Sequence, residues 1–98
     1  RFTRTLLNDA AAAITPDDAQ IVRVLESVVR DVKHKTPERV VAGPTNEGYL
    51  LIERGIPTIC GFGPDGANAH AIDEYVEIDS LVETAALFAI TALRMISL

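Results

Sequence analysis

The stretch that decides the fold is "GIPTICGFGPDGANAHAIDEYVEIDSL", residues 55–81. Residues 56–63 are rich in β-branched side chains and close on glycines, which predicts a short strand. Residues 64–74 show no period and predict an irregular loop, whereas residues 75–78 alternate like another short strand. Asp79 then caps a final helix, in which apolar residues recur at helical spacing.

Upstream of this stretch the sequence predicts two helices separated by a strand. A long amphipathic helix is expected to begin at its N-cap Thr15 and to end before Pro37. Residues 38–43 form a short apolar run closed by glycine, which suits a buried strand, and residues 44–55 predict a short helix. The apolar stripe of the long helix comprises Ile21, Val22, Val24, Leu25, Val28, Val29 and Val32.

The predicted order is helix, strand, helix, strand, loop, short strand, helix. Such alternation favours an α/β layer with largely parallel strands, and the loop at 64–74 would then lie at a carboxyl edge of the sheet, where α/β proteins bind ligands. Two or three strands make a thin sheet, so the wide apolar stripes need more protein to cover them. Residues 1–14 have no clear period and are interpreted as a linker or a severed edge strand. Because the chain begins with Arg1 rather than Met, we expect a piece of a longer protein.

Composition excludes several classes of function. The net charge is −5, which argues against nucleic-acid binding, because phosphate contacts need a basic face. No apolar run reaches the length of a membrane span, and the N-terminal residues lack the pattern of a signal peptide. The single cysteine, Cys60, excludes an internal disulfide and fits a reducing, cytoplasmic compartment.

Two features resemble functional motifs but have simpler explanations. Gly61, Gly63 and Gly66 match G-x-G-x-x-G, yet no helical period follows them, so they are interpreted as a glycine-rich turn rather than a dinucleotide site. Cys60 lies in an apolar segment without a neighbouring base and is expected to be a small packed side chain.

The two histidines receive different interpretations. His34 lies between two lysines at the end of the long helix, where a solvated helix end is favoured over a metal site. His70 follows a pliable lead-in of small residues, and Asp73 and Glu74 come soon after it. These carboxylates could orient a metal-bound imidazole. A zinc site needs three or four protein ligands, so any further ligands of a His70 site must lie on other polypeptide.

The turn "GPTNEGY", residues 43–49, leaves two interpretations open. It is either a plain capped helix start, with Thr45 or Asn46 as the cap, or a turn whose backbone N–H groups and Thr45 hydroxyl present donors to an anionic ligand.

Residues 15–98 resemble the C-terminal end of the catalytic domain of zinc-dependent metallopeptidases of the aminoacylase, acetylornithine deacetylase and succinyl-diaminopimelate desuccinylase type. The resemblance is most specific at "GIPTICGFGP" and "AHAIDEYVEIDSL". It implies a zinc-exopeptidase-like three-layer α/β/α domain, with residues 1–14 as the return from an absent inserted dimerisation domain. It further implies that His70 is the last ligand of a two-zinc centre, with Asp73 and Glu74 holding its orientation. Gly43, Thr45 and Asn46 would form part of the substrate pocket.

The same resemblance implies an activity for the parent protein. Such enzymes cleave the amide bond of N-acyl amino acids or short peptides, using two metal ions (zinc, with cobalt or manganese as substitutes) that acidify a bridging water, and a glutamate that takes its proton. The remaining ligands and the glutamate would lie upstream, in the rest of the same catalytic domain, and the parent would be a homodimer. On this interpretation the 98-residue piece alone is inactive. The alternative is a non-catalytic α/β module that binds a partner without metal.

Overall fold

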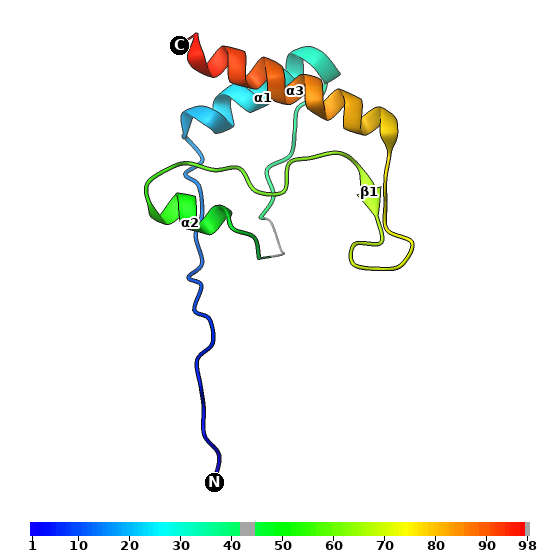
Figure 1. Cartoon of the computed structure of the whole chain (residues 1–98). Helices are drawn as coiled ribbons and strands as arrows, with labels where there is room; N and C mark the ends of the chain where they lie inside the picture. Colours follow the sequence, from blue (N-terminus) through cyan, green and yellow to red (C-terminus); the bar gives the residue numbers. More distant parts are fainter. Residues whose placement is uncertain (42–44, 98) are drawn as a thin grey trace.

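Two helices pack side by side at one end of the molecule, at the top of the view in Figure 1. The computed structural model describes residues 1–41 and 45–97. Helix α1 (Gln20–Lys33) and helix α3 (Ile78–Ile96) enclose a small core in which Val28 and Leu87 are almost completely shielded from solvent. Each turn of an amphipathic helix brings residues three and four positions apart onto one face, which explains the buried residues of α1. They are Val24, Leu25, Val28 and Val29.

The long N-terminal helix begins one turn later than its sequence predicts. Residues 16–19 form a turn in which the N–H of Ala19 donates to the carbonyl of Pro16 (3.0 Å), and α1 starts at Gln20. The expected N-cap, Thr15, uses its hydroxyl elsewhere: Oγ1 accepts the N–H of Thr58 (2.9 Å) and donates to the carbonyl of Thr58 (2.5 Å). Because this hydroxyl is occupied, it cannot satisfy the first N–H groups of the helix.

The described residues of the two strands expected before the loop do not form strands. Residues 38–41, the described part of the first one, and residues 56–63 have neither helix nor strand. A strand exists only where a neighbour pairs with its backbone, and at Thr58 the Thr15 hydroxyl occupies both backbone groups. The expected parallel sheet is therefore wrong for the described residues, whose one ladder is antiparallel. The observed architecture is a small helical arrangement with little sheet, consistent with part of an α/β domain.

That ladder lies partly within the stretch expected to be a loop. Strand β1 (Gly66–Ala67) pairs antiparallel with β2 (Tyr75–Val76), Gly66 opposite Val76 and Ala67 opposite Tyr75. Two hydrogen bonds of Asp65 fasten this hairpin to the start of α3. The N–H of Asp65 donates to Oγ of Ser80 (2.7 Å), and its carbonyl accepts the N–H of Glu77 (2.8 Å). The short strand expected at 75–78 is confirmed at its first two residues.

Helix α2 (Gly48–Glu53) is short and has well-defined ends. The N-cap of α2 is Glu47, without a side-chain capping bond, so the prediction of Thr45 or Asn46 as the cap is wrong by one or two residues. Asn46 Oδ1 instead accepts the N–H of Gly48 (2.9 Å) from the position before the cap. At the other end Gly55 adopts φ +78°, and the N–H groups of Gly55 and Ile56 donate to the carbonyls of Ile52 and Leu51. This pair of bonds is a Schellman motif, for which glycine is favoured because it adopts positive φ without strain.

Ion pairs join α1 to its surroundings at the surface. Lys33 contacts Glu83 of α3 (2.7 Å), a hydrogen bond that raises the pKa of Lys33, and Arg94 of α3 contacts Asp31 (2.7 Å). Arg39, beyond the end of α1, forms a bidentate contact with Glu26 and thereby lowers the pKa of that carboxyl. Exposed pairs of this kind contribute little stability individually. The apolar core, rather than these ion pairs, therefore holds the two helices together.

Helix α3 buries only one of its apolar faces. Its buried residues are Thr84, Leu87 and Thr91, and the Thr91 hydroxyl donates to the carbonyl of Leu87 (2.7 Å). The apolar residues that stand out in the sequence lie mostly outside this seam: Leu81, Val82, Phe88, Leu93 and Ile96 are all exposed. Among the described residues, no helix combines the length and apolarity needed to cross a membrane.

Replacing Leu87 tests the seam between α1 and α3. Leu87 is 2% exposed, so we expect Leu87→Ala to lower the free energy of unfolding of the 98-residue chain by about 2–3 kcal/mol through lost burial and a residual cavity. Leu93, which is 61% exposed on the same helix, is the matched control. Leu93→Ala should change the free energy of unfolding by less than ~0.5 kcal/mol. Urea unfolding followed by circular dichroism measures both, and equal losses would contradict the assignment of the buried face.

Replacing Gly66 tests the hairpin. A Cβ at Gly66 would overlap the backbone carbonyl oxygen of Tyr75, which cannot rotate away, so Gly66→Ala should separate the two strands. A Cβ at Gly63 would have no atom within 4 Å, which makes Gly63→Ala the control. We expect faster amide hydrogen exchange at residues 66–67 and 75–77 in the first variant only. Unchanged protection in Gly66→Ala would show that the close approach does not hold the hairpin.

Candidate functional site

His70 lies in the seven-residue loop, 68–74, that joins β1 to β2. Two successive turns shape this loop: the N–H of Ala71 donates to the carbonyl of Asn68 (2.9 Å), and the N–H of Glu74 donates to the carbonyl of Ala71 (3.3 Å). Asn68 and His70 both have positive φ, 62° and 68°, a region that asparagine and histidine enter more readily than most residues. The side chain of His70 is exposed. The loop therefore presents an accessible imidazole from a hairpin that is anchored to α3.

The carboxylates expected beside His70 are close in sequence but are not bonded to it. Asp73 and Glu74 are both exposed, and the described structure contains no side-chain hydrogen bond or ion pair between either one and His70. Glu74 instead lines a shallow hollow beside the hairpin together with Pro64, Gly66, Ala67, Ala69, Tyr75 and Val76. The role of Asp73 and Glu74 in orienting His70 stays a prediction.

The donors needed for a complete metal site do not converge within the described residues. No group of three or more His, Cys, Asp or Glu side chains is arranged there so that it could hold a metal ion. The role of His70 as a single ligand stays a prediction, and the exposure of its side chain leaves it accessible to a metal that other polypeptide also binds.

The expected substrate turn lies apart from the His70 loop. Gly43 is outside the described residues, whereas Thr45 and Asn46 are exposed and Asn46 is engaged with Gly48 at the start of α2. Figure 1 shows α2 and the β1 hairpin on opposite sides of the segment that connects them. The described site residues Thr45, Asn46 and His70 thus do not line one hollow.

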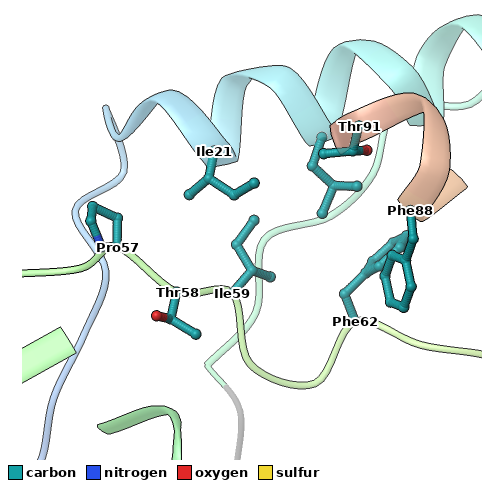
Figure 2. Close-up of a pocket in the computed structure, with 8 residues that line it drawn as sticks. Ile21, Pro57, Thr58, Ile59, Phe62, Phe88 and Thr91 are labelled. Atoms are coloured by element: carbon teal, nitrogen blue, oxygen red, sulfur yellow. The ribbon is translucent and has the colours of Figure 1, made fainter. Parts of the chain in front are cut away.

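The apolar groove beneath α1 and α3 is lined by residues without titratable side chains. It is lined by Ile21, Leu25, Pro57, Thr58, Ile59, Phe62, Phe88 and Thr91 (Figure 2). Its two threonine hydroxyls donate to the carbonyls of Ile56 and Leu87. Phe62 and Phe88 pack with ring centroids 5.9 Å apart, so the groove is the open side of the core.

The remaining candidate motifs behave as their simpler explanations predict. Residues 61–77, all of which the structure describes, contain no helix after the third glycine, and Gly66 begins β1 instead. A dinucleotide fingerprint requires a helix there. His34 is exposed and ends α1 in the left-handed conformation, with its N–H bonded to the carbonyl of Arg30.

One contact near the substrate turn could not be found by inspection of the sequence. Cys60 and Gly48 are far apart along the chain, yet the Cys60 thiol lies directly against the Gly48 backbone. Sequence spacing carries no signal for such a contact, because the intervening turns have no regular period.

Comparison with known proteins assigns the chain to a family. The model of "Peptidase family M20/M25/M40" matches residues 2–94. The chain is also 32% identical over 72 residues to a succinyl-diaminopimelate desuccinylase of Pseudoalteromonas atlantica, an alignment that covers 74% of this chain and 19% of that protein. The chain thus spans about a fifth of the length of this relative, and no solved structure matches it. Because the family match covers almost all of its residues, the chain belongs to peptidase family M20/M25/M40.

Proposed function

We propose that this chain is the C-terminal part of the catalytic domain of a zinc-dependent hydrolase that cleaves the amide bond of N-acyl amino acids or short peptides. The family match over residues 2–94 carries the proposal. The relative from Pseudoalteromonas, whose name specifies removal of a succinyl group, supports the N-acyl substrate class. Within the whole enzyme, residues 1–14 would be the return from an inserted domain and residues 15–98 would complete the catalytic domain.

His70 is proposed to supply one ligand to a two-metal centre. Its exposure at the end of an anchored hairpin supports this role, since a ligand must be both accessible and fixed in position. Zinc is the expected metal, with cobalt or manganese as substitutes, and when bound it would acidify water and polarise the scissile carbonyl. His70 would act as a neutral imidazole that holds the metal, and Asp73 or Glu74 would orient its ring.

Thr45 and Asn46, with Gly43, are proposed to contact the substrate. Both described residues are exposed at the N-terminal turn of α2, where a hydroxyl and backbone N–H groups can donate to the carboxylate of an amino-acid substrate.

The rest of the catalytic domain is the proposed partner of the exposed apolar surface. The face of α3 formed by Leu81, Val82, Phe88, Leu93 and Ile96 and the open side of the groove leave large apolar side chains exposed. Contiguous exposed apolar surface is typical of an interaction site. A relative about four times as long as this chain offers the additional polypeptide that would cover it.

Replacing each of the two histidines with asparagine tests the proposed function. Both have positive φ, a conformation that asparagine tolerates, so His70→Asn and His34→Asn should keep the backbone. In the complete protein, we expect His70→Asn to reduce hydrolysis of N-acyl amino acids at least about a hundredfold and to lower zinc content measured by elemental analysis. His34→Asn should change neither quantity. Unchanged zinc in His70→Asn would refute the ligand role, and a wild-type protein without zinc would favour the alternative, a binding module.

The effect of Leu93→Ala in the complete protein and in the 98-residue chain tests whether other polypeptide covers the exposed face of α3. Leu93→Ala should cost about 2 kcal/mol or more in the complete protein, where the residue would be buried, although it costs little in the 98-residue chain. Thermal and urea unfolding of both proteins measure the difference. A neutral effect in the complete protein would show that this face stays in solvent.

A further inference from the structure

Gly48, in the first turn of α2, lies in close contact with Cys60, which belongs to the segment that follows the helix. Gly48 is half-buried, and a Cβ placed on it would overlap Sγ of Cys60, lie 2.7 Å from Oδ1 of Asn46 and lie 3.6 Å from Cγ2 of Thr58. The N–H of the same glycine donates to Asn46 Oδ1 (2.9 Å). Gly48 therefore touches both the exposed turn that precedes α2 and the segment 58–60.

Glycine is required at this position by space rather than by backbone conformation. Gly48 is the first residue of α2 and does not have positive φ, so any L-residue could adopt its backbone angles. Gly55 is the opposite case: its φ is +78°, and a Cβ there would have nothing within 4 Å. At Gly48 the whole conflict would be with the side chains of Cys60 and Asn46.

Both sides of the contact are held by hydrogen bonds. Thr58, two residues before Cys60, is held at both its N–H and its carbonyl by the hydroxyl of Thr15. The exposed turn at Thr45 and Asn46 is joined to α2 by the bond from Asn46 to Gly48. An atom inserted between Gly48 and Cys60 would therefore strain the bond through which Gly48 holds this turn.

We propose that Gly48 and Cys60 form a positioning contact that sets where the Thr45–Asn46 turn lies and thereby how tightly the enzyme binds its substrate. The inference rests on the proposed function, which places Thr45 and Asn46 at the substrate. Cys60 acts here as a packed side chain of fixed size, because its thiol fills the space that the absent Cβ of Gly48 leaves. Neither residue touches the metal or the reacting atoms.

The test is a double-mutant cycle in the complete hydrolase. Gly48→Ala should raise KM for an N-acyl amino acid between about tenfold and a hundredfold, the effect of misplacing a binding group by about an ångström, with little change in kcat. Adding Cys60→Ala removes the overlapping sulfur and should restore most of the lost KM. Cys60→Ser keeps a γ atom and should restore less. Gly63→Ala, at a position with open space, is the control and should leave KM unchanged.

Two measurements, KM and the midpoint of thermal unfolding, distinguish failure of this contact from failure of the proposed function. The midpoint of thermal unfolding, measured for the wild type, Gly48→Ala, Cys60→Ala and the double variant, reports the coupling between positions 48 and 60 without reference to activity. Loss of coupling, or a Gly48→Ala defect that Cys60→Ala leaves unrepaired, overturns the contact. Coupling without a KM change overturns the positioning role. A wild-type protein that hydrolyses no N-acyl amino acid overturns the proposed function, and the link to substrate with it, while the thermal cycle still tests the contact.

Discussion

The seam between α1 and α3, centred on Val28 and Leu87, is the interaction on which the rest of the structure depends. It provides the surface on which Ile59 and Phe62 pack, so the segment that leads to the hairpin is held beneath the two helices. The first turn of α3 in turn holds Asp65, and Asp65 immediately precedes β1. The apolar core thus holds α3 in place, α3 holds Asp65, and Asp65 fixes the base of the hairpin that carries the His70 loop.

The small amount of sheet follows from the same dependence on neighbours. A helix satisfies its backbone internally, whereas a strand needs another strand beside it. The segment at 56–63 has β-branched residues suited to a strand, but a threonine hydroxyl takes the backbone groups of Thr58. An α/β sequence pattern can therefore be present without the sheet, because the pattern specifies which side chains are buried and not which partner is available.

Local features of this chain were predictable from sequence, and choices between competing partners were not. The buried face of α1 and the Gly55 helix end follow from periodicity and capping, and the resemblance located the His70 motif, whereas the cap of α2 is Glu47 and not Thr45 or Asn46. Thr15 was assigned to the wrong partner because its hydroxyl suits an N-cap as well as it suits Thr58. On α3 the apolar residues surround most of the helix, so their spacing cannot tell which face packs on α1. The contact of Gly48 with Cys60 depends on turns that have no period.

The two proposed site regions differ in how firmly they are held, and this difference suits their roles. The base of the His70 hairpin is fixed by backbone groups, and the close approach of Gly66 to the Tyr75 carbonyl leaves it little freedom. A metal ligand needs such support, because small displacements weaken coordination. The Thr45–Asn46 turn is held through side chains that a substitution can exchange. On the proposed assignment, changes at Asn46, Gly48 or Cys60 would alter how tightly the carboxylate of the substrate is held while the support of His70 stays intact.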